Sequence, residues 1–307
     1  MCGIVGILSR NKKDDLGSLV IEMMKRLQHR GRDGAGVAMY GGISLKKDQY
    51  LIRAEILGED LEEKQSAMEK ITDLANRYGN VRSIRNVVES EEYFITDFLV
   101  EKVDDFQKVR KLALEIQGLE NVAVLSAGKF EMFKDVGTID VVDSIYGVSE
   151  KGGTHAIGHI RFSTESGVDR YHAHPFQSFL YPDITVVHNG QITNYWNTRK
   201  KLEAKGHYFT TDNDTECIVH YVADKLLDGY SLEEALENAV KDLDGPFAFI
   251  IATPDEIGVA KDKLGLRPAM VAEGDGMYAI SSEEVALEPL ELETEYLAPG
   301  EFRVYRK

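Results

Sequence analysis

The sequence predicts an α+β fold in which helices and strands form separate layers instead of alternating β-α-β units. The C-terminal part contains a series of short apolar strands, at 247–252, 257–260, 269–272, 277–281 and 302–305. Three helical stretches are grouped ahead of them, at 194–204, 214–227 and from Ser231 onward. Strands in successive hairpins, with helices grouped beside them, are typical of layered α+β domains.

The first forty residues predict a strand, a helix and a second strand. Val5–Leu8 is apolar and begins with a β-branched residue, as buried strands often do. Apolar residues recur at helical spacing over Leu16–Leu27. A glycine-rich turn at 31–36 then leads into a strand at Val37–Tyr40.

Two further apolar runs, at 155–162 and 184–187, predict strands ahead of the grouped helices. The first two of those helices end at Gly206 and Gly229, because glycine commonly terminates a helix. Ser231 and Glu234 have the spacing of a capping box and therefore start the third helix.

The segment from about 44 to 148 differs from the rest of the chain in its dense charge and in lacking the glycine–polar motifs described below. We predict one domain over residues 1–307, interrupted at about 44–148 by an inserted α/β subdomain. The predicted elements of this subdomain are helices at 62–78 and 105–117 and strands at 122–125 and 130–133.

Composition excludes several classes of protein. The chain has 307 residues and a formal net charge of −16, which disfavours binding to nucleic acid or to an anionic membrane. No stretch approaches the roughly 20 apolar residues that a membrane helix needs. The two cysteines, Cys2 and Cys217, form no disulfide framework, so we expect a cytoplasmic protein.

Cys2 becomes the first residue if Met1 is removed, and it then carries a thiol and a free α-amine on one carbon. An N-terminal nucleophile can use its own amine as the general base. An α-amine with a pKa of about 7.8 is roughly one-seventh neutral at pH 7, whereas a lysine amine is neutral in only about 0.04% of molecules. The alternative is that Cys2 is a small buried apolar residue.

Four later segments concentrate polar groups that could serve such a nucleophile: LQHRGRDGAG (27–36), GHIRFSTES (158–166), VVHNGQITN (186–194) and TTDNDTE, which ends at Glu216. Asn189-Gly190 is, by local rules, a type I′ hairpin turn. The alternative is an oxyanion site made by the Asn189 amide and the Gly190 N–H. Arg161 and Asp214 offer one cation and one anion for an amino-acid substrate.

Together with MCGIVGI at the N-terminus, these segments resemble the class II, N-terminal-nucleophile glutamine amidotransferases. That family includes the glutaminase domains of amidophosphoribosyltransferase, glucosamine-6-phosphate synthase, asparagine synthetase and glutamate synthase. The resemblance covers 1–44 and 148–307, with further matches in AKDKLGLRPA (260–269), ISSE (280–283) and APGE (298–301). It implies a four-layer α/β/β/α sandwich of the N-terminal-nucleophile hydrolase type.

The resemblance also implies roles for individual residues. Cys2 attacks the side-chain amide of L-glutamine, and its amine passes the proton to the departing ammonia. Asn189 and Gly190 form the oxyanion hole. The implied substrate-binding residues are Arg161 for the α-carboxylate, Asp214 for the α-ammonium, Thr164 in the same motif as Arg161, and Arg30 in a loop that closes over the site.

TES, AHPF (173–176) and VVHNGQITN are most similar to the glutamate synthase branch and its stand-alone relatives, such as the small subunit of N-methylglutamate synthase. Arg32 and Glu165 replace a proline and a histidine of other relatives. We therefore expect a glutaminase that passes ammonia to a separate synthase subunit. The chain itself is expected to need no cofactor, whereas the partner would carry FMN or Fe–S. A homo-oligomer remains open.

The sequence leaves three alternatives, each with an observation against it. A metal site among the histidines of 155–188 is disfavoured, because strand alternation separates them and no cysteine lies nearby. An N-terminal-nucleophile amidase acting on another amide would not need both Arg161 and Asp214. A non-catalytic regulatory subunit that keeps the fold would not need Cys2, Asn189 and Gly190.

Overall fold

The computed structural model describes residues 1–163 and 167–307, and the chain forms two compact units. The larger unit comprises Met1–Gly42 and Met132–Lys307, and the smaller unit comprises Ile43–Glu131. Among the described residues, no helix is long and apolar enough to cross a membrane.

Over the residues that the structure describes, the larger unit contains two sheets and five α-helices. Its strands are β1 (Gly3–Lys13), β2 (Gly34–Tyr40), β7 (Phe130–Val136, which starts at the boundary), β8 (Gly153–Arg161), β9 (Phe176–Ser178), β10 (Ile184–Gly190), β11 (Phe247–Ala252), β12 (Glu256–Lys261), β13 (Met270–Gly274), β14 (Met277–Ser281), β15 (Glu293–Tyr296) and β16 (Phe302–Arg306). Its α-helices are α1 (Leu16–Arg26), α4 (Ile139–Tyr146), α5 (Tyr195–Ala204), α6 (Asp214–Leu227) and α7 (Leu232–Asp242), with short 3₁₀ turns that include η1 (Gln28–Arg30).

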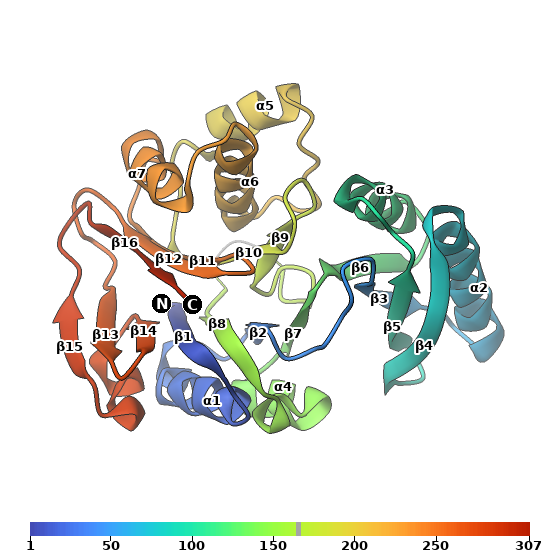
Figure 1. Ribbon diagram of the computed structural model, residues 1–307, viewed down its shortest axis with the longest axis horizontal. Helices are drawn as coiled ribbons and strands as arrows, with labels where there is room; N and C mark the ends of the chain where they lie inside the picture. Colours follow the sequence, from blue (N-terminus) through green and yellow to red (C-terminus); the bar gives the residue numbers. More distant parts are fainter. Residues whose placement is uncertain (164–166) are drawn as a thin grey trace. The chain divides into compact units, whose positions relative to one another are not determined.

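The two sheets of the larger unit stack between two layers of helices (Figure 1). The seven-stranded sheet has the order β15-β13-β14-β1-β8-β2-β7, and the five-stranded sheet has the order β16-β12-β11-β10-β9. Helices α1 and α4 lie on the outer face of the first sheet, and α5, α6 and α7 lie on the outer side of the second. The predicted four-layer α+β sandwich is therefore confirmed.

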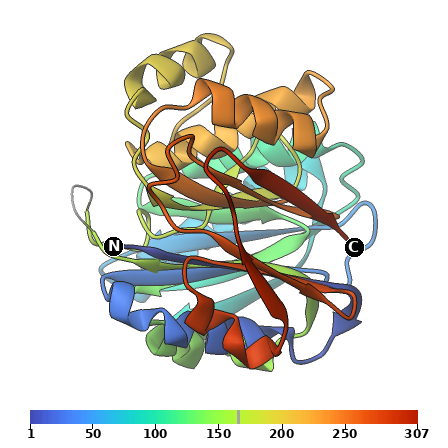
Figure 2. The same ribbon diagram turned by 90° about the vertical axis from the view of Figure 1, so that its left-hand side faces the viewer.

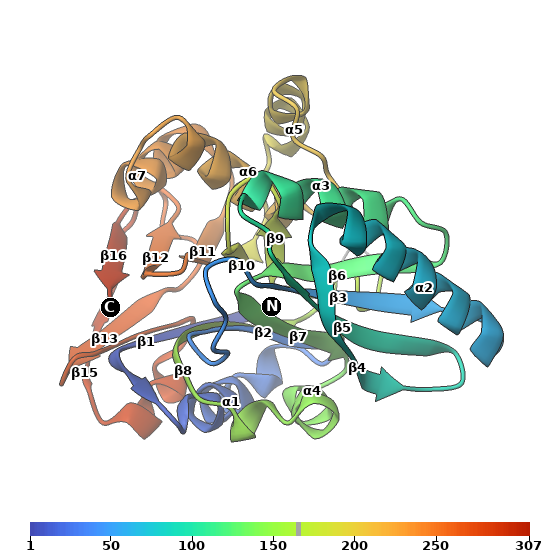
Figure 3. The same cartoon turned by 45° about the vertical axis from the view of Figure 1, so that its right-hand side comes forward.

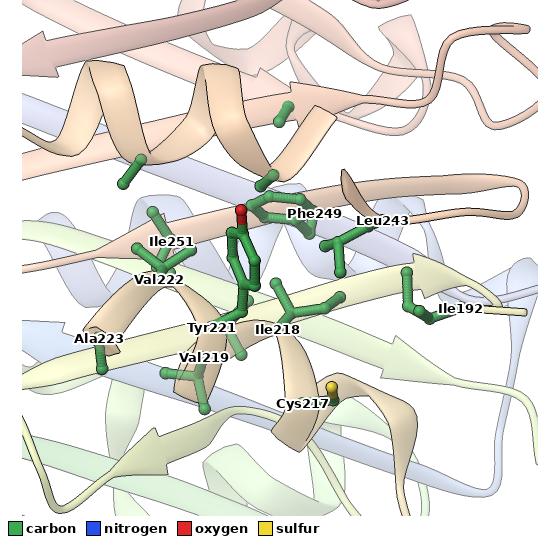
Figure 4. Packing of buried hydrophobic residues seen from close by; sticks show 14 of the residues in the cluster. Ile192, Cys217, Ile218, Val219, Tyr221, Val222, Ala223, Leu243, Phe249 and Ile251 are labelled. Carbon is green, nitrogen blue, oxygen red and sulfur yellow. The ribbon is translucent and has the colours of Figure 1, made fainter. Parts of the chain in front are cut away.

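A hydrophobic core fixes α6 against the five-stranded sheet (Figure 4). Ile218 and Val222 lie one turn apart on α6 and pack with Phe249 and Ile251, which alternate along β11. The helix begins at its N-cap Asn213, whose side chain accepts a hydrogen bond from the backbone two residues later. This packing and cap hold the first turn of α6 at a defined place beside the sheet.

Strand pairing in the seven-stranded sheet brings the N-terminus to the end of β8. Strands β1 and β8 are antiparallel, with Gly3 opposite Ile160. On the other side of β8, Gly34 of β2 pairs with Arg161. The two chain termini lie at opposite ends of these layers (Figure 2). These two pairings bring the ends of β1, β8 and β2 together next to Cys2.

The smaller unit is a four-stranded antiparallel sheet with two helices on one face (Figure 3). Its elements follow the order β3 (Tyr50–Leu57), α2 (Leu61–Tyr78), β4 (Asn80–Glu89), β5 (Tyr93–Glu101), α3 (Phe106–Gln117) and β6 (Val122–Gly128). With the sheet order β4-β5-β3-β6, this is the split β-α-β arrangement of ferredoxin-like domains.

The boundary of this unit differs from the sequence prediction of 44–148. The compact unit ends at Glu131, and residues 132–148 belong to the larger unit. Strand β7 forms the edge of the seven-stranded sheet, and α4 packs against α1 and β2. The difference arises because long-range sheet pairing, which local composition does not reveal, decides where residues 132–148 belong.

A buried histidine makes the stability of the larger unit depend on pH. His155 is fully buried, its Nε2 lies 2.8 Å from the Thr253 carbonyl oxygen, and burial lowers its pKa to about 4. Between pH 6.5 and 4 the unfolded chain binds a proton that the folded chain excludes, so stability falls as pH falls. Between pH 7 and 5, urea unfolding should show wild type losing about 2 kcal/mol more than His155→Gln. An equal loss in both proteins would contradict this.

Candidate active site

Cys2 lies just before β1, against the end of β8. Its Sγ accepts the backbone N–H of Phe162 at 3.4 Å and is 3.5 Å from the Phe162 carbonyl oxygen. Burial raises the pKa of the thiol, although the Phe162 N–H, the N-terminus and Arg161 partly offset this effect. The thiol is therefore protonated at neutral pH and needs a base before it can act as a nucleophile.

Arg30 holds the backbone of Cys2. This side chain is buried, its Nε donates to the Cys2 carbonyl oxygen at 2.7 Å, and Nη1 pairs with Glu283. Glu283 also contacts His29 at 2.9 Å. These contacts of Arg30 are thus with the Cys2 backbone and with Glu283. The contact of Arg30 with substrate remains a prediction.

Arg161 is the last residue of β8 and is only 3% exposed. Its Nη1 donates to the Gly167 carbonyl oxygen at 2.7 Å, and burial lowers the pKa of the guanidinium. The backbone of Gly31 lies so close that a Cβ there would be 2.2 Å from the Arg161 carbonyl oxygen. Asp33 continues this contact, since its N–H donates to the same oxygen at 3.1 Å. The glycines of residues 31–36 thus allow this segment to pack onto the end of β8.

Asn189 and Gly190 end strand β10 and do not form a hairpin turn, because Gly190 pairs with Phe247, far away in sequence. Gly190 has φ +145°, and a Cβ there would lie 2.0 Å from the Pro246 carbonyl oxygen, so only glycine fits. The Nδ2 of Asn189 is buried and has no hydrogen-bond partner among the described residues. A buried amide donor without a partner is rare in proteins and fits a group that awaits a ligand.

Asp214 is the first residue of α6. Its Oδ2 accepts the backbone N–H of Ile192 at 2.8 Å, and its Oδ1 lies 3.6 Å from Nδ1 of His188. Burial alone would raise the pKa of this carboxyl, but His188 and the hydrogen bonds lower it below its ordinary value. Asp214 is therefore a carboxylate at neutral pH. A buried cation at Arg161 and an anion at Asp214 are both present in the larger unit.

Contacts connect the predicted residues across the two sheets. Cys2 contacts Phe162, the residue that follows Arg161, and the ring of His159 on β8 reaches the His188 carbonyl oxygen on β10 at 3.1 Å. The predicted substrate contact Thr164 and the substituted Glu165 lie outside the described residues. Within the described ranges, no group of three or more His, Cys, Asp or Glu is placed to hold a metal ion.

Sequence reasoning missed several residues that shape this region. Glu283 was seen only as part of a motif, yet it anchors Arg30. Asp33 accepts the Ser163 N–H at 2.7 Å and so holds the chain after β8. His159 and His174 were considered only as metal ligands, whereas the structure stacks their rings with centroids 3.9 Å apart. Their positions on separate elements gave no local signal of this contact.

Comparison with known proteins gives the following similarities. The sequence pattern of the family described as "Glutamine amidotransferase domain" matches residues 161–289. The chain is 48% identical over 309 residues to a protein of Methanothermobacter thermautotrophicus assigned as a glutamine amidotransferase, covering 99% of each chain. It is 34% identical over 293 residues to the glutamine amidotransferase-like protein GlxB of Rhizobium meliloti, covering 94% of this chain and 91% of GlxB.

Among solved structures, the fold is similar to that of glutamine phosphoribosylpyrophosphate amidotransferase from B. subtilis, with a TM-score of 0.63 and 21% sequence identity. The match covers 99% of this chain and 47% of that enzyme, so the chain spans about half of its length. At this identity the likeness concerns the fold alone. It shows that the layered sheets and helices have the same arrangement as in that enzyme.

Proposed function

The chain belongs to the glutamine amidotransferase family of the N-terminal-nucleophile type, and from that premise we propose that it hydrolyses L-glutamine to L-glutamate and ammonia through a thioester on Cys2. We further propose that it delivers the ammonia to a separate synthase subunit of the glutamate synthase type. The observation that carries the proposal is the buried amide of Asn189 at the end of β10, whose nitrogen has no hydrogen-bond partner among the described residues. Strand β10 contacts β8 through His159 and His188, and Phe162, directly after β8, contacts Cys2.

The proposed reaction begins when the α-amine of processed Cys2 takes the thiol proton. The sulfur forms a bond to the side-chain carbonyl carbon of glutamine, and the carbonyl oxygen becomes an oxyanion. The Asn189 amide and the Gly190 N–H donate to that oxygen and lower the energy of the tetrahedral species. The C–N bond then breaks, and the ammonium of Cys2 returns its proton to the departing ammonia. Water hydrolyses the thioester by the same steps and releases glutamate.

Recognition of a free amino acid is supported by the two charged groups described above. Arg161 presents a guanidinium, which can bind a carboxylate through two hydrogen bonds. Asp214 keeps its charge at neutral pH and suits an α-ammonium group. Thr164, which lies in the same sequence motif as Arg161, would add a hydroxyl contact to the substrate. An amidase for other amides would have no use for this pair of charges.

The Arg161 role is tested by binding to a Cys2→Ala protein, in which no turnover disturbs calorimetry. Arg161→Lys keeps the charge but loses the planar fork, so glutamine should bind about 10- to 150-fold more weakly, which corresponds to about 1.5–3 kcal/mol. Asp214→Asn should weaken binding by a similar factor. Arg10→Lys is the matched control, because Arg10 hydrogen-bonds Tyr278 on the exposed surface.

The same measurement separates the glutaminase from its competitors. Glutamine amide, in which the α-carboxylate is replaced, should bind far more weakly than glutamine to the Cys2→Ala protein. Arg161→Lys should distinguish the two ligands much less. If the Cys2→Ala protein with Arg161 intact binds both ligands equally well, Arg161 does not bind the carboxylate. That result is expected of a general amidase. A non-catalytic subunit would bind neither ligand.

The proposed synthase partner rests on sequence features of the glutamate synthase branch, such as AHPF at 173–176. A tagged chain, recovered from its native cells, should bring with it a synthase that contains FMN or Fe–S. The complex should form glutamate from glutamine and the acceptor, with free ammonia able to replace glutamine. Recovery of a phosphoribosyl- or sugar-transferring partner instead would contradict this part of the proposal.

A further inference from the structure

Three histidines with no step in the proposed reaction are buried next to the oxyanion pair. His159 lies on β8, His174 precedes β9 and His188 lies on β10, immediately before Asn189. The rings of His159 and His174 stack with an interplanar angle of 22°. Buried polar rings are retained in proteins when their hydrogen bonds hold something in place. The direction of each hydrogen bond therefore shows what these rings do.

The protons of His174 can be assigned from its two partners. The backbone N–H of His188 donates to Nδ1 of His174 at 3.4 Å, so this nitrogen carries a lone pair. Burial lowers the pKa of His174 well below its ordinary value, and the ring is neutral. Its one ring proton is therefore on Nε2, which lies 3.3 Å from Oγ1 of Thr215 and donates to it.

Thr215 completes a closed ring of hydrogen bonds. Its oxygen accepts from His174, its own hydrogen reaches Oδ1 of Asp214 at 3.5 Å, and the same oxygen lies 3.1 Å from Nδ1 of His188, with which it shares a hydrogen bond. The path runs from the His188 N–H to His174, from His174 to Thr215, and from Thr215 back to the side chain of His188. In addition, Nε2 of His159 donates to the His188 carbonyl oxygen at 3.1 Å. The N–H, the carbonyl and the side chain of His188 are all held.

We propose that His174 and Thr215 are positioning residues which, by closing this ring around His188, set the direction of the Asn189 amide and the Gly190 N–H. This inference rests on the proposed function, because it assigns the ring a task in stabilising the oxyanion. Catalytic donors must be held within about 0.5 Å of their working position, and a strand end is otherwise free to shift. Thr215 also follows Asp214 directly, so one turn of α6 serves both sites.

Thr215→Val removes the hydroxyl at nearly constant volume, and His174→Phe keeps an aromatic ring while removing both nitrogens. Each change should lower kcat for glutamine hydrolysis about tenfold and leave KM within about twofold, because the oxyanion exists only in the transition state. Thr215→Ser, which restores the hydroxyl, and His174→Asn, which restores an acceptor near Nδ1, should each recover most of the rate.

A closed ring also predicts how the two changes combine. Once either member is lost, the ring is open and the second change removes nothing more. The kcat of the double variant Thr215→Val/His174→Phe should therefore lie within about twofold of the kcat of the slower single variant. The control is Thr185→Val, which changes a residue of β10, the strand that also carries Asn189. The Thr185 hydroxyl contacts the Tyr40 hydroxyl at 2.7 Å and takes no part in the ring of hydrogen bonds. This control should keep kcat within twofold of wild type.

A second readout follows alkylation of Cys2 by a glutamine analogue that carries a diazoketone in place of the amide. The variants should be alkylated about tenfold more slowly by this reagent and at the wild-type rate by iodoacetamide, which needs no oxyanion hole. Additive effects in the double variant, a raised KM with unchanged kcat, or wild-type rates in both single variants would overturn the inference alone. A wild-type protein that neither hydrolyses glutamine nor reacts with the analogue would overturn the proposed function, and the inference with it.

Discussion

A protein that keeps residues in front of Cys2 should hydrolyse no glutamine, and activity should appear once they are removed. The experiment uses an N-terminal extension that a specific protease removes to leave Cys2 first. Burial raises the pKa of the Cys2 thiol, so the sulfur needs a base. In the extended protein the residue-2 nitrogen is an amide and cannot accept a proton, whereas a freed α-amine can act as the general base.

The measurement pairs intact mass with glutamate release, before and after cleavage of one protein sample. The chain expressed from its own Met1 should likewise have the mass of a protein that begins at Cys2. Cys2→Ala carried through the same cleavage controls for activity from contaminating enzymes. Turnover by the uncut protein at the rate of the cut protein would rule out the α-amine as the base. Arg30 would hold Cys2 in both forms, because it binds the carbonyl oxygen and not the nitrogen.

Strong local signals gave accurate elements in the larger unit. Helix α6 has the predicted bounds, Asp214–Leu227, because a capping residue and a glycine frame a continuous apolar stretch. The capping box of Ser231 and Glu234 is present and starts α7. Strands β11 and β14 also have their predicted bounds. In each case the information lies within a few residues of the element.

The smaller unit was harder to predict because charged residues interrupt its strands. In β3 and β5, Arg53 and Asp97 face each other across the sheet and form a buried pair at 2.7 Å. In the sequence each resembles a solvent-exposed loop residue, so the strands were not recognised. The long edge strand β4 has two register shifts and exposes most of its side chains, which hides its period. Pairing between strands, and not local pattern, defines this unit.

The chemistry of the site was readable from residue types, but its geometry was not. Cys2 and Phe162 are 160 positions apart and touch because β1 and β8 pair in one register. No local pattern specifies that register. The sequence left Asn189-Gly190 open between a turn and an oxyanion site, and the pairing of Gly190 with Phe247 excludes the two-residue turn. The roles assigned to these residues remain predictions that mutation must test.

Asn189→Ala should lower kcat for glutamine hydrolysis about 10²- to 10³-fold, or about 3–4 kcal/mol, with little change in KM. The amide nitrogen is buried and has no hydrogen-bond partner among the described residues, so the ground state loses no bond when it is removed. The developing oxyanion, in contrast, loses a hydrogen-bond donor. An interaction made only in the transition state affects kcat and not binding.

Two variants make the Asn189 result specific. Asn189→Asp has the same shape but replaces the donor by an acceptor, so it should be at least as slow as the alanine variant. Asn194→Ala removes an amide that bridges Asp242 and Asp244 on the surface, and it should leave kcat unchanged. A rise in KM with kcat intact would mean that Asn189 positions the substrate. Calorimetry on Cys2→Ala with and without Asn189→Ala distinguishes the two roles, because an oxyanion donor should leave glutamine affinity within about twofold.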